Sequence, residues 1–169
     1  MPGMFCVEDP PVSRNDVLCD GDNTYTIRGQ LGLGNYSSVW LAKTESSTQQ
    51  PGQFRLVAVK ISNHNASTSD GLELALARKQ IRLELSGEET GEVMKKLLLP
   101  ESTFAFNDSK GSLRRAFTFG DLYGLTVFEY AKGCPNRRME WAAAKRCALD
   151  TISGLAFLHQ NGIGHGGQS

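Results

Sequence analysis

Three segments with the composition of β-strands follow one another early in the chain, and the connections between them are short. Residues 25–31 alternate in strand fashion, residues 38–42 read Ser-Val-Trp-Leu-Ala, and residues 54–61 read Phe-Arg-Leu-Val-Ala-Val-Lys-Ile. β-Branched and aromatic residues of this kind favour strands. The turn-rich residues 32–36 connect the first two strands, and the polar residues 44–53, which end in Pro-Gly, form a loop before the third. The strands are therefore expected to pair as an antiparallel meander.

Five further segments carry secondary-structure signals. A helix over about residues 70–86 is preceded by serine and threonine N-cap candidates and followed by a glycine. Residues 102–106 are strand-like, and residues 115–119 and 122–128 flank a Gly-Asp pair, so they are expected to form a hairpin that completes the sheet. Residues 140–159 repeat apolar side chains at helical spacing and predict an amphipathic helix.

The composition is that of one soluble globular domain. The chain has 169 residues, 40% of them hydrophobic, and its 18 basic residues balance its 18 acidic residues. A neutral chain has no electrostatic footprint for nucleic acid or for an anionic membrane. No apolar run approaches the roughly 18 residues that span a bilayer, and the N-terminus lacks the pattern of a secretory signal. We therefore expect a cytoplasmic or nuclear protein without direct nucleic-acid or membrane partners.

The cysteines predict neither a zinc site nor a disulfide framework. Cys6, Cys19, Cys134 and Cys147 form no C-x-x-C pair, and no histidine cluster accompanies them. An even count is compatible with disulfides, but a chain of this size without a secretory signal favours reduced thiols. No metal site is predicted.

The connection between the first two strands carries the strongest chemical signal. Taken alone, the pair Gly32 and Gly34 is weak, because such pairs mark turns in many proteins. A dinucleotide-binding fingerprint would lie between a strand and a helix. Here the glycines join two strands, the second strand contains Val39, and the third carries the Ala-Val-Lys sequence that ends at Lys60. That order matches the protein-kinase signature, in which G-x-G-x-x-G-x-V precedes V-A-I-K.

On these residues the chain resembles the ATP-binding half of a eukaryotic-type serine/threonine protein kinase. The resemblance implies an α+β fold, in which a kinase-like small lobe is followed by the first long helix of an otherwise missing large lobe. The small lobe would consist of a five-stranded antiparallel sheet with one helix. Residues 1–22 would be a flexible leader, residues 23–131 the small lobe with the ATP-binding loop and hinge, and residues 132–169 the truncated start of the large lobe.

The resemblance also assigns residues to ATP. Val39 would pack on one face of the adenine, and Ala58 is small enough to leave room for the ring. Lys60 would neutralise the α- and β-phosphates, and its charge would need a glutamate on the next helix. Glu73 is the preferred partner by spacing, and Glu84 is the alternative. The glycine-loop residues expected at the nucleotide are Leu31, Gly32, Leu33, Gly34, Asn35, Tyr36, Ser37, Ser38 and Val39.

Residues 125–131 are similar to the last small-lobe strand of a kinase as it runs into the hinge. By this resemblance Phe128 is the gatekeeper, and the backbone of Glu129 and Ala131 hydrogen-bonds the adenine edge. Ser37 in place of the third glycine, a tryptophan after the valine, and the Phe-Glu pair at the hinge resemble the SR-protein kinase group and its fungal relatives.

One position departs from the family pattern. Gly167 stands where a kinase has its catalytic aspartate, and the magnesium-binding residues that follow it in the family are absent from this sequence. Phosphoryl transfer depends on positioning and on charge neutralisation by magnesium. We therefore expect ATP binding but little catalysis by the chain as written, with a protein substrate bound only if a longer form exists. The alternative is a pseudokinase-like module that binds a nucleotide or a partner without catalysis.

The helix over residues 141–158 is expected to be exposed, since nothing else in the sequence can cover it. Its apolar stripe is then a partner-binding or self-association surface, or an aggregation liability. A short transcript and a misread gene boundary would both produce such a chain. The stripe consists of Trp141, Ala144, Ala148, Ile152, Leu155 and Leu158.

Overall fold

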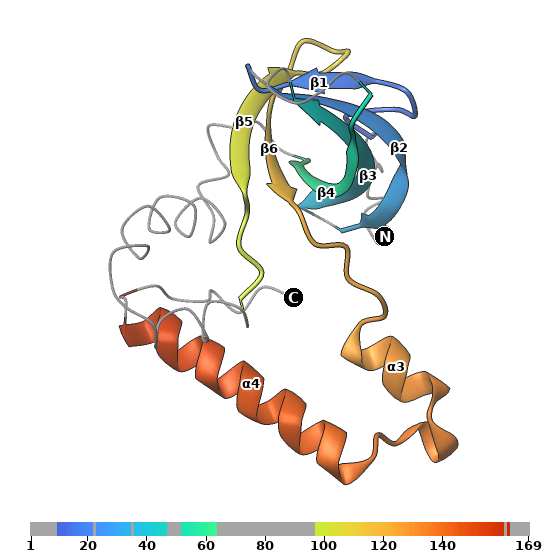
Figure 1. Cartoon of the computed structure of the whole chain (residues 1–169), viewed down its shortest axis with the longest axis vertical. Helices are drawn as coiled ribbons and strands as arrows, with labels where there is room; N and C mark the ends of the chain where they lie inside the picture. Colours follow the sequence, from blue (N-terminus) through green and yellow to red (C-terminus); the bar gives the residue numbers. More distant parts are fainter. Residues whose placement is uncertain are drawn as a thin grey trace, which may run out of the picture. The chain divides into compact units, whose positions relative to one another are not determined.

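The computed structural model of the chain divides into two compact units (Figure 1). The first unit comprises Met1–Asp70 and Glu101–Asp121, and the second comprises Gly71–Pro100 and Leu122–Ser169. The border after Asp121 lies earlier in the chain than the lobe boundary predicted after residue 131. The structure describes residues 10–21, 23–34, 36–46, 52–63, 97–160 and 162.

Within the described residues of the first unit, six strands form one antiparallel sheet that is strongly curled (Figure 1). Their order across the sheet is β1-β2-β3-β4-β6-β5. The three strands predicted first are confirmed as β2, β3 and β4, and the strand predicted over residues 102–106 is confirmed as β5. The strands are β1 Val17–Cys19, β2 Asn23–Leu33, β3 Ser37–Ser46, β4 Arg55–Ser62, β5 Ser102–Asn107 and β6 Leu113–Phe119.

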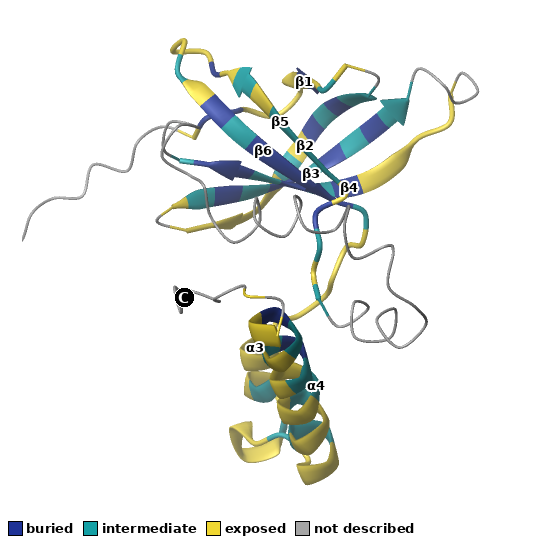
Figure 2. Cartoon of the chain, turned by 90° about the vertical axis from the view of Figure 1, so that its left-hand side faces the viewer, coloured by how far each residue is buried: buried dark blue, intermediate teal, exposed yellow. Residues whose placement is uncertain are grey.

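The core lies against one face of this sheet. Successive side chains of a strand point to opposite faces, and Figure 2 shows the resulting alternation of buried and less buried residues along the strands. In β4 the buried apolar positions are Val57, Val59 and Ile61. The core cluster consists of Val12, Leu18, Tyr25, Ile27, Trp40, Ala42, Val57, Val59, Ile61 and Ala116, with Phe104 and Phe106 packed against it.

The predicted loose leader over residues 1–22 is wrong for its second half. Leu18 lies in β1, which pairs with β2, and both Val12 and Leu18 are buried in the core. The sheet therefore has one strand more than the five expected. A strand of three residues with a single inward side chain is too short to show a period in the sequence, which explains the miss. Residues 1–9 lie outside the described part.

A buried tyrosine ties the start of the sheet to its other end. The Tyr25 hydroxyl donates to Asp20 Oδ2 at 2.7 Å, and Ser102 Oγ donates to the same oxygen at 3.1 Å. The Tyr25 ring stacks on Phe104 with 5.3 Å between ring centroids. Burial is the main cause that raises the pKa of Tyr25 to about 12, and the neighbouring Asp20 charge adds to it.

We predict that Tyr25→Phe destabilises the protein by about 1 kcal/mol at neutral pH, the net value of an ordinary hydrogen bond. The wild-type tyrosine should also make folding sensitive to alkali. Its pKa is raised from 10.0 to about 12, so its contribution is complete below pH 10 and is lost as the pH rises towards 12. Urea denaturation across that pH range should show this loss in the wild type and not in Tyr25→Phe. The exposed Tyr36→Phe serves as the control; an equal alkaline loss in Tyr25→Phe would contradict the assignment.

The second unit contains two helices and a short 3-10 turn among its described residues: α3 Val127–Gly133, η1 Pro135–Arg137 and α4 Trp141–Gln160. The long helix predicted over residues 140–159 is confirmed as α4. Leu158 is buried against Leu97 and Leu99. A Cβ added at Gly154 would lie 3.2 Å from Leu97 Cδ2, so the small residue allows this close packing. The helix predicted over residues 70–86 lies outside the described residues.

The strand predicted over residues 122–128 is wrong, because this stretch leads into α3 instead. The actual hairpin is formed by β5 and β6, and β6 corresponds to the predicted residues 115–119. Thr126 is the N-cap of α3, and its hydroxyl accepts from the Glu129 amide at 3.2 Å while the Glu129 carboxylate accepts from the Thr126 amide at 2.9 Å. This Thr-x-x-Glu capping box stabilises the helix start and overrides the strand propensity of the valine and phenylalanine within it.

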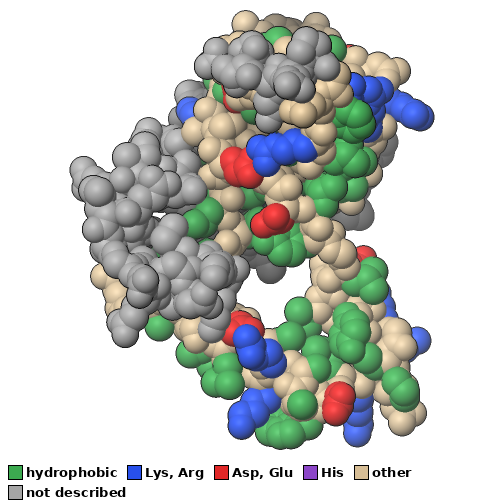
Figure 3. Space-filling model, viewed as in Figure 1, with side chains coloured by type: hydrophobic (Ala, Val, Ile, Leu, Met, Phe, Trp, Pro, Cys, Tyr) green, Lys and Arg blue, Asp and Glu red, His purple; other side chains and the backbone are tan. Residues whose placement is uncertain are grey.

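The outer surface of α4 carries large apolar side chains. Trp141, Leu149 and Ile152 are each more than half exposed, with Trp141 at 79%. Figure 3 shows hydrophobic side chains gathered over α3 and α4. Of the stripe that was expected to be exposed, Trp141 and Ile152 are exposed, whereas Leu158 is buried against Leu97 and Leu99, so the expectation that nothing covers this helix is wrong near its C-terminal end. The role of the stripe as a partner or self-association surface stays a prediction. No helix in the described part of the chain is both long and apolar enough to cross a membrane.

Candidate functional site

The candidate site is the face of the sheet that points away from the core. Because β4 buries Val59 and Ile61 on the core side, Ala58 and Lys60 belong to the opposite face. Lys60 is directly opposite Val39 of β3 and Phe117 of β6, and Val39 is directly opposite Gly32 of β2. Side chains of directly paired residues lie about 5 Å apart. The register thus aligns the predicted glycine, valine and lysine in one row across four strands.

A second row on the same face runs parallel to the first. Ala58 pairs with Leu41 of β3 and with Phe119 of β6, and Leu41 pairs with Gly29 of β2. The small Ala58 side chain lies between the larger Leu41 and Phe119, so the surface formed by this row is recessed at Ala58. Phe119 was predicted as part of a strand but not as a site residue, and only the observed pairing of β4 with β6 could have identified it.

Both rows end on a glycine of β2, and the space above these glycines is open. A Cβ added at Gly29 or Gly32 would meet no described atom within 4 Å, and neither residue has a positive φ. The fold of the described residues therefore does not itself require glycine at these positions. Bulges between Ile27 and Gly29 and between Gln30 and Gly32 add twist to this end of β2. The open space lies at the β2 end of the two rows, since Phe117 and Phe119 at the β6 end are buried.

The glycine loop is a tight hairpin connection between β2 and β3. The Gly34 amide donates to the Ser37 carbonyl at 2.8 Å, and the side chains of Leu33 and Tyr36 are more than half exposed. Leu31, near the C-terminal end of β2, is also exposed. Asn35, another predicted loop residue, lies outside the described part.

Ser38 differs from the other predicted loop residues, because its side chain faces the core. It is fully buried, and its hydroxyl accepts a hydrogen bond from Trp40 Nε1 at 2.9 Å. Ser38 and Trp40 are both on the buried side of β3, as their separation of two residues requires. The Ser38 side chain therefore cannot contact a ligand on the candidate face, although its role through the backbone stays a prediction.

Lys60 and Arg115 give the candidate face its positive charge. Both are partly buried, and Arg115 lies two residues from Phe117 along β6, so it projects from the same face as Lys60. The Arg115 amide donates to Ser62 Oγ at 3.2 Å, which places Arg115 beside the C-terminal end of β4. Two cations on one face suit an anionic ligand. The predicted partners of Lys60, Glu73 and Glu84, lie outside the described residues.

The predicted hinge residues are found on α3 in the second unit. The Phe128 ring is 68% exposed and lies under Lys132, whose Nζ is 4.2 Å from the ring centroid. The Thr126 backbone and hydroxyl bind the Glu129 carboxylate and hold its pKa below the usual range. Ala131 accepts the Cys134 amide at 3.2 Å. The adenine-binding role predicted for Phe128, Glu129 and Ala131 depended on a strand that the structure does not contain.

The strand that ends at the edge of the candidate face is β6, and Gly120 follows it. Across this exit Arg55 and Glu101 form a bidentate ion pair, with one contact of 3.0 Å between Arg55 Nη1 and Glu101 Oε1. A Cβ added at Gly120 would lie 1.9 Å from Glu101 Oε1 and 2.9 Å from Arg55 Nη1. The glycine therefore lets this pair close over the backbone at the end of β6.

We predict that Gly120→Ala costs less than about 1 kcal/mol, because the methyl group displaces only the ends of two half-exposed side chains. The cost should be non-additive with that of Glu101→Ala, since both changes remove the same ion pair. A double-mutant cycle by urea denaturation measures this. Fully additive effects would show that Gly120 has another reason to be a glycine.

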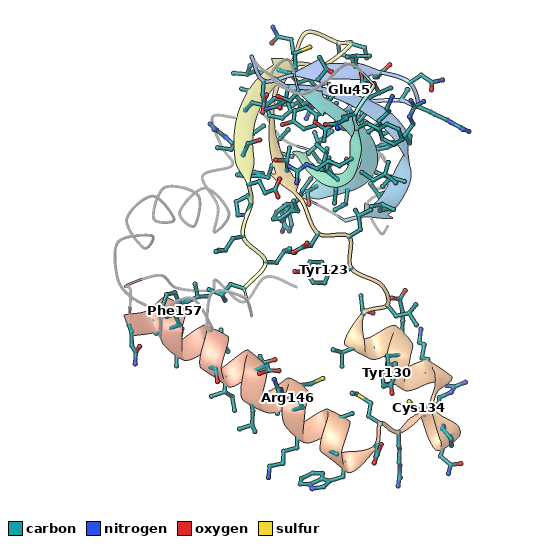
Figure 4. All side chains as sticks on the ribbon, in the orientation of Figure 1. Glu45, Tyr123, Tyr130, Cys134, Arg146 and Phe157 are labelled. Carbon is teal, nitrogen blue, oxygen red and sulfur yellow. The ribbon has the colours of Figure 1, made fainter. Side chains whose placement is uncertain are left out.

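A shallow apolar hollow of about 420 Å³ lies between α3 and α4. Tyr130 and Arg146, on α3 and α4 respectively, mark the two helices in Figure 4. The residues that line the hollow are Leu125, Val127, Tyr130, Met139, Ala143 and Cys147. The described cysteines Cys19, Cys134 and Cys147 are free, and no three potential metal ligands cluster among the residues that the structure describes.

Comparison with known proteins adds a distant relative. The chain is 27% identical over 177 residues to serine/threonine-protein kinase TOS3 of Saccharomyces cerevisiae, a match found for strains YJM789 and S288c alike. The match covers 92% of this chain and 26% of the relative, so the chain spans about a quarter of the length of the curated relatives it matches. No family model matches the chain.

The chain is thus similar to a serine/threonine protein kinase over most of its length. This agrees with the kinase resemblance of the glycine loop and of the strand that carries Lys60. TOS3 is a serine/threonine-protein kinase by name and supports no finer group, so the similarity to SR-protein kinases rests on the loop and hinge residues alone.

Proposed function

We propose that this chain is the ATP-binding portion of a serine/threonine protein kinase. The observation that carries the proposal is the row in which Gly32, Val39 and Lys60 face the same side of the sheet. These are the residue types that the kinase signature places at the nucleotide. The distant similarity to a yeast serine/threonine kinase supports the same conclusion.

In this proposal the nucleotide lies along the candidate face. The adenine packs over the low centre of the second row, on Ala58, with Val39 beside it. The phosphates lie towards Lys60, whose ammonium group is held on a strand that is paired on both sides. A cation that is already held rigidly loses little conformational entropy when it neutralises the phosphate charge. Arg115, further along the same face, adds to the positive potential there.

The edge of the adenine is assigned to the exit of β6. The predicted gatekeeper was the last residue of the final strand of the sheet, and in the structure that position is occupied by Phe119. Phe119 is paired with Ala58, so it borders the space proposed for the ring. The backbone that follows, from Gly120, would then supply the hydrogen bonds to the adenine.

Phosphoryl transfer to a protein serine or threonine is the activity proposed for the larger kinase. Its Mg²⁺ would have to be held by residues beyond those described, because the described part contains no cluster of acidic ligands. The present residues therefore support nucleotide positioning, and no step of the transfer is assigned to them. Membership of the SR-protein kinase group, favoured by Ser37 and Trp40, is the finer form of this proposal.

We predict that Lys60→Ala weakens binding of a non-hydrolysable ATP analogue by about 1–3 kcal/mol, the range of a charge-assisted contact. Adenosine binding should change little, because adenosine has no phosphate for Lys60 to neutralise. Isothermal titration calorimetry on the wild type and the variant measures both affinities. Lys110→Ala, at an exposed turn, is the matched control. An unchanged affinity for the analogue in Lys60→Ala would remove Lys60 from the site.

A non-catalytic nucleotide-binding module is the second candidate, and Gly167 at the position of the catalytic aspartate favours it. We predict that the chain binds the ATP analogue yet transfers no phosphate to serine- or threonine-containing peptides above the level of Lys60→Ala. The reason is that no carboxylate at position 167 can orient the substrate hydroxyl. Transfer from γ-labelled ATP measures this. Activity that depends on Lys60 would exclude the non-catalytic reading.

A further inference from the structure

Asn63 contacts the glycine loop at two places. Its amide nitrogen donates to the Tyr36 carbonyl at 2.8 Å, and its side-chain Nδ2 donates to the Gly34 carbonyl at 2.9 Å. Asn63 directly follows β4, the strand that carries Lys60. Asn63 therefore links two carbonyl groups of the glycine loop, those of Gly34 and Tyr36, to the end of β4.

A buried ion pair lies behind Asn63. Arg114 of β6 donates from Nη1 to the Asn63 carbonyl and from Nε to Asp108 Oδ2, the latter at 2.8 Å. Asp108 is nearly fully buried in the turn between β5 and β6, where it also accepts the amides of Lys110 and Ser112 at 2.9 Å each. Burial works against ionisation of this carboxyl, but the hydrogen bonds from Arg114 and the two amides outweigh it and lower its pKa.

These contacts form a continuous chain of hydrogen bonds from Asp108 through Arg114 and Asn63 to the glycine loop. We propose that Asn63 is a positioning residue that holds the glycine loop against the end of β4 and thereby prepares it for the phosphates of a nucleotide. The role in nucleotide binding rests on the proposed function, whereas the restraint on the loop stands on the contacts alone.

The direction of the contacts explains why such a restraint would help an anionic ligand. Carbonyl oxygens carry partial negative charge and would repel phosphate oxygens if they turned towards the candidate face. Asn63 binds the Gly34 and Tyr36 carbonyls and so keeps them from turning. A loop that is ordered before binding also loses less conformational entropy when the ligand arrives. Leu33, the residue before Gly34, is more than half exposed, so its side chain adds little packing to hold the loop in place.

The test compares Asn63→Ala with Asn107→Ala, a matched change at an exposed asparagine at the end of β5. Asn63→Ala removes the side-chain donor to Gly34 and keeps the backbone contact to Tyr36. We expect its affinity for a non-hydrolysable ATP analogue to fall about fivefold, the effect of one ordinary hydrogen bond. Adenosine affinity should be unchanged, and Asn107→Ala should match the wild type for both ligands.

Hydrogen exchange without nucleotide separates the restraint from the function. The Gly34 amide donates to Ser37, so its exchange reports opening of the loop, and it should be about fivefold faster in Asn63→Ala. Unchanged exchange at Val57 and Val59 would show that the sheet itself is intact. Wild-type exchange at Gly34 in Asn63→Ala would overturn the proposal.

The two measurements together distinguish the possible failures. Faster exchange with an unchanged analogue affinity would overturn the role of Asn63 in binding while Lys60→Ala still reported on the site. Faster exchange in a wild-type protein that binds no ATP analogue would support the restraint and overturn the proposed function.

Discussion

The two-residue alternation of β4 is the constraint on which the rest of the structure depends. Val57, Val59 and Ile61 are fully buried on one side of this strand, and the strand is hydrogen-bonded to β3 and β6 on its two edges. A shift of register by one residue would expose the core residues and bury Lys60. The hydrophobic core and the candidate site are therefore specified by the same strand, and neither can move without the other.

Much of this arrangement could be predicted from the sequence because it depends on local periodicity. The strands around the glycine loop, the strand that carries Lys60 and the long helix α4 were all indicated by patterns of period two or close to four. Ala58 and Lys60 must share a face of the strand because they are two residues apart. What the sequence could not show is which residues of the other strands lie opposite them, since register depends on long-range pairing.

The errors have equally specific causes. In β1 only Leu18 points inward, and a single inward side chain gives no recognisable period. The burial of the Ser38 side chain follows from its position in β3, two residues before the buried Trp40, and its backbone role at the nucleotide stays a prediction. Residues 122–128 contain good strand formers, yet the reciprocal capping of Thr126 and Glu129 favours a helix there. That capping signature was present in the sequence and could have been recognised. The exit of β6 at Phe119 could not, because it depends on pairing with β4.

The hydrogen-bond chain that ends at the glycine loop also has a consequence for the turn between β5 and β6. Asp108 in the β5–β6 turn is linked to the loop through Arg114 and Asn63. If this turn stabilises the ligand-binding form of the loop, a ligand that binds the loop stabilises the turn by the same coupling free energy. The coupling is reciprocal by thermodynamic necessity. The β5–β6 turn, which is remote from the glycine loop in the sequence, thus becomes a place where occupancy of the face can be sensed.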